Sequence, residues 1–248
     1  MGPGDSCILP RMPIVEQWLA GRDFARRHAE AAQMINFVYF LGDAETRRAW
    51  LVDPAWAVDE LVAAVRDRGY ELAGALLTHW HPDHAGGDLF GLMVEGAHEL
   101  HERTGVPVHA HRAEAPWLAR VSRLPATALR LHEADAELQL DGVSVRCVHT
   151  PGHTPGSTCY LVAGEGAGWL FTGDVLFVGS CGRVDLPGSN PVEMARTLTV
   201  RLATLPPGTI VYPGHDYGVR PTSTLGEERA SNPYLAPGAL AGWLGDAR

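Results

Sequence analysis

The feature that most constrains this chain is a run of metal-binding side chains at residues 78–84, with the sequence Thr-His-Trp-His-Pro-Asp-His. Four potential ligands fall within six residues, directly after an apolar stretch that we predict to be a strand. In an extended chain, side chains two positions apart point the same way, so His79, His81 and Asp83 can converge while His84 points elsewhere. This arrangement suits two neighbouring metal ions better than one. Imidazole and carboxylate ligands without thiolates favour zinc, iron or manganese.

Three further polar motifs each follow an apolar stretch and lie beside glycine. His153 lies in Thr-Pro-Gly-His-Thr-Pro-Gly-Ser, Asp174 in Thr-Gly-Asp, and His215 in Pro-Gly-His-Asp. Loops at strand ends are where functional sites commonly assemble, so we expect these side chains to meet the first cluster. Each motif alone is weak, but the complete order of histidines and aspartates is specific.

Hydrophobic periodicity predicts two groups of strands, each followed by helices, which indicates a layered α/β sandwich in a single domain. We expect strands at residues 36–41, 49–52, 72–77, 106–109, 142–148, 159–162, 169–172 and 209–212. We expect helices at residues 58–68, 94–103, 113–120, 192–205 and 225–231, and a loop over residues 119–136.

The order of these motifs resembles the metallo-β-lactamase superfamily from about residue 36 to residue 234. The likeness is greatest to short glyoxalase II (hydroxyacylglutathione hydrolase) enzymes and to the related persulfide dioxygenases. It implies an α/β fold, an αββα sandwich with the metal site at one edge of the two sheets. The whole of residues 1–248 would form one domain, with a core at about 36–234, an N-terminal extension at 1–30 and a tail at 236–248.

The resemblance also implies two divalent metal ions, with zinc favoured over iron or manganese, and a bridging hydroxide that attacks a thioester. Asp83 and Asp174 would be the catalytic carboxylates, and Asp53 would orient a ligand imidazole. The implied ligands are His79, His81 and His153 for the first ion, Asp83, His84 and His215 for the second, and Asp174 for both.

Two residues resemble glyoxalase II positions that bind glutathione. Arg183, in Gly-Ser-Cys-Gly-Arg, matches a basic residue that holds the glycine carboxylate, and Tyr217 matches a tyrosine that touches the same ligand. The structural alternatives are that Arg183 pairs with Asp185 and that Tyr217 simply packs. We therefore expect a metallo-hydrolase that cleaves a thioester such as an S-acyl-glutathione-type substrate.

A second activity stays open at this stage. In the persulfide dioxygenases, the residues that match His79, His153 and Asp174 hold a single iron ion, a set of two histidines and one carboxylate. All three residues are present in this chain. The ligand set therefore does not separate a thioester hydrolase from a mononuclear iron persulfide dioxygenase.

The amino-acid composition disfavours several classes of binding partner and cellular location. With 20 Lys+Arg against 29 Asp+Glu, the formal net charge of −9 disfavours nucleic-acid binding. No apolar run is long enough to span a membrane, and residues 1–20 lack a secretory pattern. The cysteines form no C-x-x-C pair, so we read them as free thiols in a reducing cytoplasm; they are Cys7, Cys147, Cys159 and Cys181. We expect a cytoplasmic enzyme with a small thioester or thiol-derived substrate, and the oligomeric state stays open.

Overall fold

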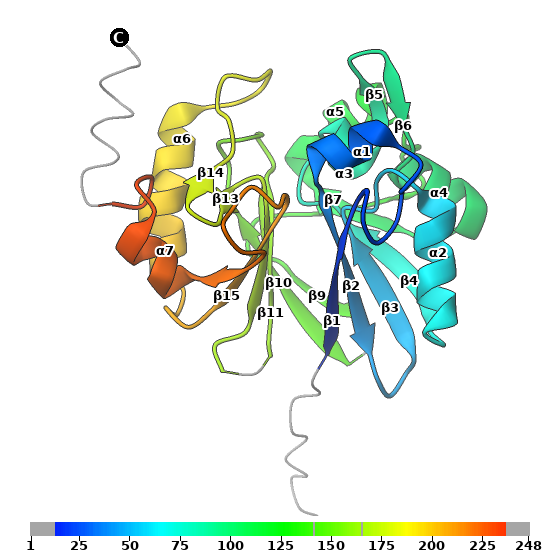
Figure 1. Ribbon diagram of the computed structural model, residues 1–248, viewed down its shortest axis with the longest axis horizontal. Coiled ribbons are helices and arrows are strands. Elements are labelled where there is room, and N and C mark those ends of the chain that lie inside the picture. The colour runs from blue at the N-terminus through cyan, green and yellow to red at the C-terminus, as the bar shows by residue number, and fades with distance from the viewer. Residues whose placement is uncertain (1–12, 141, 165, 237–248) are drawn as a thin grey trace, which may run out of the picture.

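Two six-stranded sheets face each other in the computed structural model, and helices cover their outer faces (Figure 1). The structure describes residues 13–140, 142–164 and 166–236. The predicted αββα sandwich is confirmed. Within the described residues, no helix is both long enough and apolar enough to cross a membrane. Most of the predicted tail and Cys7 lie outside the described residues.

The first sheet carries the N-terminal half of the chain. Across the sheet its strands are β1 (Ile14–Leu19), β2 (Phe37–Asp43), β3 (Arg48–Val52), β4 (Glu71–Leu76), β7 (Val108–His111) and β8 (Leu129–His132). Its helices are α1 (Ala29–Met34), α2 (Val58–Asp67), α3 (Pro82–Ala85), α4 (Ala97–Thr104) and α5 (Ala115–Val121). A separate hairpin, β5 (Gly87–Leu89) with β6 (Leu92–Val94), follows α3.

The second sheet carries the C-terminal half. Across the sheet its strands are β16 (Ser223–Thr224), β15 (Ile210–Pro213), β12 (Trp169–Gly173), β11 (Thr158–Val162), β10 (Val143–His149) and β9 (Glu137–Leu140). A short hairpin, β13 (Leu176–Phe177) with β14 (Ser180–Cys181), follows β12, and the helices are α6 (Pro191–Arg196) and α7 (Leu225–Ser231).

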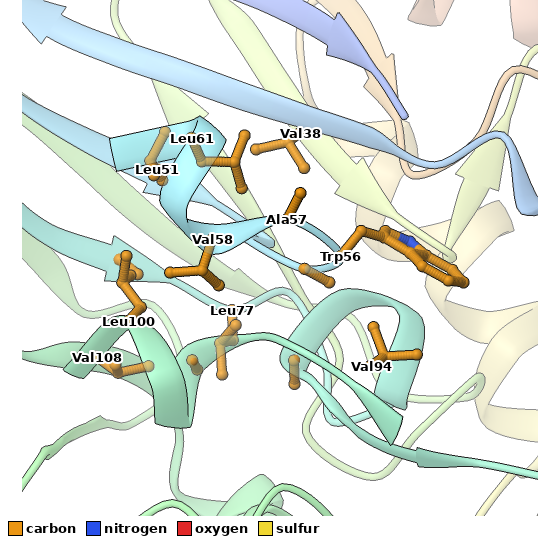
Figure 2. Packing of buried hydrophobic residues seen from close by; sticks show 14 of the residues in the cluster. Val38, Leu51, Trp56, Ala57, Val58, Leu61, Leu77, Val94, Leu100 and Val108 are labelled. Carbon is orange, nitrogen blue, oxygen red and sulfur yellow. The ribbon is translucent and has the colours of Figure 1, made fainter. Parts of the chain in front are cut away.

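Helix α2 shows how the sequence pattern produces the outer layer. Its residues Val58, Leu61 and Val65 recur at helical spacing and are all buried. Figure 2 shows Val58 and Leu61 facing the sheet, in the same cluster as Val38 and Leu51. Each such side chain contributes roughly 1.5–3 kcal/mol when it is fully buried. This packing fixes the first sheet beneath its helices.

Strand β2 is buried on both faces, because it lies between the helical layer and the second sheet. Val38 and Phe40 pack in the cluster under the helices, whereas Phe37, Tyr39 and Leu41 pack in the cluster between the sheets. Alternation along a strand sends successive side chains to opposite faces. The continuous apolar run at residues 36–41 is explained by this double burial.

The sandwich starts earlier than the predicted core, because β1 lies inside the predicted N-terminal extension of residues 1–30. It pairs antiparallel with β2, from Ile14 opposite Gly42 to Leu19 opposite Phe37. As an edge strand it is mostly half-buried or exposed, so its sequence lacks a clear apolar run.

The predicted loop at residues 119–136 is wrong in part. Helix α5 continues to Val121, and β8 pairs parallel with β7 at the edge of the first sheet. The half-buried Leu-Arg-Leu-His sequence of β8 is too short for periodicity to reveal. The predicted helix at 94–103 starts at Ala97, after β6, and the one at 192–205 is α-helical only to Arg196, with a π turn after it.

Three of the cysteines lie in the described residues, and all three are free, as predicted: Cys147, Cys159 and Cys181. Burial raises the pKa of each thiol to about 12. Each is therefore a protonated, poorly nucleophilic thiol at neutral pH.

Candidate metal centre

The histidine and aspartate motifs meet at one edge of the sandwich, where α3 itself carries Asp83 and His84. Strands β12 and β15 run parallel, with Gly173 opposite Pro213. The residues that follow them, Asp174 and His215, therefore leave the second sheet at the same edge. The run at residues 78–84 leaves β4 of the first sheet, and His153 lies in the loop between β10 and β11.

The first cluster is extended only as far as His81. Pro82 occupies the first turn of α3, a position that suits its fixed φ, so Asp83 and His84 lie on a helical turn. The expectation that Asp83 points with His79 and His81 is therefore wrong. The turn ends at Gly86, where φ is +83° and an added Cβ would lie 2.7 Å from the backbone of Gly96.

The first ligand group consists of His79, His81 and His153. One ring nitrogen from each lies within 4.8 Å of the others, and all three side chains are buried. Nε2 of His153 is 2.9 Å from Nδ1 of His81. Three converging imidazoles of this kind can hold a metal ion.

The second ligand group consists of Asp83, His84 and His215. Nε2 of His84 is 3.1 Å from Nε2 of His215, which in turn is 3.4 Å from Oδ2 of Asp83. Their donor atoms also lie within 4.8 Å of one another and are buried. This group can hold a second ion.

Asp174 lies between the two groups. Its Oδ1 is 3.2 Å from Nε2 of His84 and 3.4 Å from Nε2 of His215, whereas its Oδ2 is 3.5 Å from Nε2 of His153. One carboxylate oxygen thus faces each group. Nε2 of His79 is buried and has no hydrogen-bond partner among the described residues. Buried polar atoms without a partner are costly, so these residues fit a bound metal ion.

Asp53 lies directly behind the cluster. Its Oδ1 accepts a 2.7 Å hydrogen bond from the Thr78 amide, and its Oδ2 accepts one of 2.6 Å from the Thr78 hydroxyl. Oδ2 is also 3.0 Å from Nδ1 of His84. This contact turns Nε2 of His84 toward the centre. Asp53 itself has a φ of +53°, an unusual conformation for an aspartate before proline.

Two other histidines are oriented by backbone carbonyl groups. Nδ1 of His215 donates to the carbonyl of Met34, and Nδ1 of His153 donates to the carbonyl of Arg183, each over 2.7 Å. A hydrogen bond at Nδ1 fixes the tautomer and leaves Nε2 free to bind a metal ion.

Burial and neighbouring charges act in opposite directions on the pKa values of the histidines and aspartates in the two ligand groups. Burial lowers the pKa of His79 well below its usual value and that of His81 to about 3, which keeps both rings in the neutral form that binds metals. Burial also opposes charge on His84, but Asp174 and Asp83 raise the pKa of this ring well above its usual value. Burial would raise the pKa of Asp174, yet His215 and His84 hold it well below its usual range.

Sequence reasoning missed the role of Asn36, which precedes β2. Its Nδ2 donates to Oδ2 of Asp83 over 3.1 Å, and its Oδ1 accepts from Nε1 of Trp56 over 3.1 Å. The indole fixes the amide, which in turn positions Asp83. The sequence feature that could have indicated this role is a polar residue at the start of an otherwise apolar strand.

Glu114 was also missed, and nothing in its local sequence marks it. Its carboxylate is buried and accepts hydrogen bonds from the Gly156 amide (2.6 Å), the Trp80 amide (2.8 Å) and the Thr154 hydroxyl (3.1 Å). Burial raises the pKa of Glu114 to about 7, against these three hydrogen bonds. Because Trp80 and Thr154 flank metal-site histidines, Glu114 joins two of the loops that build the first group.

A cavity of about 620 Å³ opens onto the centre, lined by His81, Asp83, His153, Asp174 and His215 among others. Arg183 and Tyr217 also line it. The exposed guanidinium of Arg183 pairs with both oxygens of Asp185, with distances of 2.9 and 2.8 Å. The ring of Tyr217 stacks on His215 at 4.5 Å. Both structural alternatives are therefore present in this structure, and both side chains remain accessible from the cavity.

The comparisons with known proteins agree with this geometry. Over 182 residues the chain is 36% identical to a hydroxyacylglutathione hydrolase from Fuscovulum blasticum, covering 73% of this chain and 63% of the relative. It is 30% identical to the human mitochondrial persulfide dioxygenase ETHE1 over 203 residues, covering 81% of this chain and 71% of the relative. The crystal structure of TTHA1623 in a di-iron-bound form superposes with a TM-score of 0.65 at 33% identity, covering 82% of this chain and 96% of that one.

A sequence profile adds the decisive match, since it spans both ligand groups from His79 to His215. The profile describes the metallo-beta-lactamase superfamily and matches residues 33–215. Sequence, fold and the convergence of histidines and aspartates at the sandwich edge thus agree, and the chain belongs to the metallo-β-lactamase superfamily.

Proposed function

We propose that this protein is a hydrolase with two metal ions that cleaves thioesters of the S-acyl-glutathione type. The observation that carries the proposal is the position of Asp174, which presents one carboxylate oxygen to each of two complete ligand groups. His79, His81 and His153 would hold one ion, and Asp83, His84 and His215 the other. When bound, two such ions would lower the pKa of water and polarise the substrate carbonyl.

The chain's own carboxylates have a second role in this proposal. Hydrolysis joins a water oxygen to the acyl carbon, breaks the bond between that carbon and sulfur, and leaves a proton for the departing thiolate. Asp83 and Asp174 line the cavity, so each can accept a hydrogen bond from a water molecule beside the acyl carbon. The Asn36 amide keeps Asp83 in place for this role. A thiolate leaves without strong acid assistance, so no further acid is required.

Arg183 and Tyr217 are proposed to bind the thiol carrier. The two-point contact of Arg183 with the Asp185 carboxylate supports this role, because a substrate carboxylate could use the same planar geometry. A substrate carboxylate can take the place of Asp185, because both side chains are exposed. Tyr217 would contact the same part of the substrate from its stacked position on His215.

For the metal, we propose zinc first and iron or manganese second. Five imidazoles and two carboxylates suit all three ions. Iron is included because TTHA1623, which is 33% identical to this chain, was crystallised in a di-iron-bound form. The free thiols among the described residues accord with the reducing cytoplasm in which we place the enzyme.

A mononuclear iron persulfide dioxygenase is the second candidate, favoured by the 30% identity to human ETHE1. His79, His153 and Asp174 would hold the iron ion in that case. The group formed by Asp83, His84 and His215 would then hold no metal ion, so the number of ions bound per chain separates the two candidates.

Two parallel assays test the proposal. Protein purified without chelators is given S-lactoylglutathione and S-hexanoylglutathione, with the released thiol measured, and separately glutathione persulfide, with oxygen uptake measured. We expect thiol release, its loss on chelation and its return on adding zinc, iron or manganese. Oxygen uptake with persulfide and no cleavage of any thioester would overturn the hydrolase proposal.

A further inference from the structure

One wall of the cavity is apolar and lies on the side of the first ligand group. It is formed by Trp80, Leu89, Phe90, Val121, Leu186 and Pro187. Trp80 connects the wall to the metal centre, because its ring lies 4.4 Å from the ring of His81.

Contacts between neighbouring segments make this wall one continuous surface. Trp80 stacks on Trp117 of α5 at 4.7 Å, and Val121 lies one helical turn further along the same helix. The hairpin of β5 and β6 begins at Gly87, which lies in close contact with the backbone of Val121. A Cβ added to Gly87 would lie only 2.5 Å from the Val121 carbonyl oxygen. The loop after Pro187 touches the same helix, since a Cβ added to Gly188 would lie 3.1 Å from Trp117.

Phe90 forms the rim of this wall, at the tip of the hairpin between β5 and β6. It has a φ of +54° and is followed by Gly91 at +91°, so the chain turns tightly here. Phe90 is 99% exposed although it lines the cavity. Asp88 of the same hairpin also lines the cavity, and its Oδ1 accepts a hydrogen bond from the Gly91 amide. A ring this exposed gains from burial only when something enters the cavity.

We infer that this wall is an acyl-binding subsite, which selects thioesters with a medium-length or aromatic apolar acyl group. The inference rests on the proposed function and adds the substrate class to it. The proposed function places the thiol carrier at Arg183 and Tyr217. The apolar wall beside His81 is therefore the part of the cavity that remains for the acyl group. A two- or three-carbon acyl group would leave most of the wall exposed to water.

The test is a series of S-acyl-N-acetylcysteamine thioesters with acetyl, butanoyl, hexanoyl and octanoyl groups. For the wild type, we expect kcat/KM to rise by up to about fourfold for each buried methylene, which corresponds to about 0.8 kcal/mol. Phe90→Ala should lower the octanoyl-to-acetyl ratio of kcat/KM at least about fivefold, mainly through KM. Met93→Ala is the matched control, because Met93 is 56% exposed on the same hairpin but is not among the residues that line the cavity.

A binding measurement separates the subsite from the catalytic proposal. The S-octyl and S-methyl thioethers of N-acetylcysteamine cannot be hydrolysed, and calorimetry gives their affinities with and without metal. We expect the octyl compound to bind at least about tenfold more tightly, with the difference reduced by Phe90→Ala. Such binding without cleavage of any thioester would retain the subsite and reject the hydrolase. Equal affinities, or a chain-length ratio that Phe90→Ala leaves unchanged, would overturn the subsite.

Discussion

Asp174 lies between the two ligand groups. Its carboxylate oxygens face both of them, whereas the ion-pair contacts of His215 are with Asp83 of the second group and with Asp174 itself. Removing Asp174 would also leave two cations facing each other without the intervening negative charge.

We therefore expect Asp174→Ala to lose more bound metal than His215→Ala, and to lower kcat/KM for a thioester at least roughly tenfold further. Elemental analysis and steady-state kinetics on the two purified variants check this. Equal metal content and equal rates would show that Asp174 does not bridge.

Arg183 gives a prediction about the thiol carrier. If it binds a substrate carboxylate, Arg183→Ala should lower kcat/KM roughly 10- to 100-fold, the scale of a lost hydrogen bond to a charged group. The loss should fall on KM, since a group remote from the reacting carbonyl binds alike in the ground and transition states. Arg183→Lys should recover part of the loss, because lysine lacks the planar fork.

The control for Arg183 is its ion-pair partner. Asp185→Asn removes the competing carboxylate and should lower KM rather than raise it. A thioester that lacks the carboxylate should be cleaved alike by the wild type and Arg183→Ala. An equal loss on both substrates, or a loss of metal, would assign Arg183 to the scaffold.

Between elements, Glu114 links the loop that carries Trp80 to the loop that carries Thr154 and Gly156. Glu114→Ala leaves two buried amides without an acceptor, each costing about 1–3 kcal/mol. We expect the free energy of unfolding of the metal-free protein to fall by roughly 2–5 kcal/mol, and metal affinity to fall with it. Urea denaturation and metal titration measure the two effects.

A matched acid nearby provides the control. Glu133 is exposed and pairs with Arg112 at the surface, so Glu133→Ala should leave the free energy of unfolding almost unchanged. If the two alanine variants were equally stable, Glu114 would not hold the loops together.

The elements that the sequence predicts best are those whose side chains are most deeply buried. The interior strands and α2 follow from strong apolar periodicity, and the metal-site loops follow from dense histidines and aspartates next to glycine. The edge strands β1 and β8 escape prediction because one of their sides faces solvent, so their patterns are weak. Glu114 and Asn36 escape because their roles arise from tertiary contacts, with residues 34 or more positions away for Glu114 and 20 or more for Asn36.

At the scale of the whole molecule, a second set of histidines joins the two sheets. His111 of β7 stacks on His149 of β10 at 4.1 Å, and Nε2 of His132 in β8 is 3.1 Å from the Tyr160 hydroxyl in β11. Burial lowers the pKa of His111 and of His132 to about 4. The rings of His111 and His132 are therefore neutral in the folded state at neutral pH.

The sign of the resulting pH dependence follows from which state binds protons. Between pH 6.5 and about 4, His132 is protonated in the unfolded chain but not in the folded one, so stability is lost as the pH falls through this window. His132 alone should lower the free energy of unfolding by about 1.4 kcal/mol for each pH unit within this window. His132→Gln should flatten the slope in urea denaturation of the metal-free protein between pH 4 and 8. Parallel curves for the wild type and the variant would contradict this account.

The central claim is that the sandwich edge holds two metal ions that serve hydrolysis. The most direct measurement is the metal content of protein purified without chelators or added metal, taken together with its activity. We predict about two ions per chain and thioester cleavage that rises with occupancy of the second ion. One iron ion per chain at full activity, with oxygen consumed from glutathione persulfide, would contradict the claim.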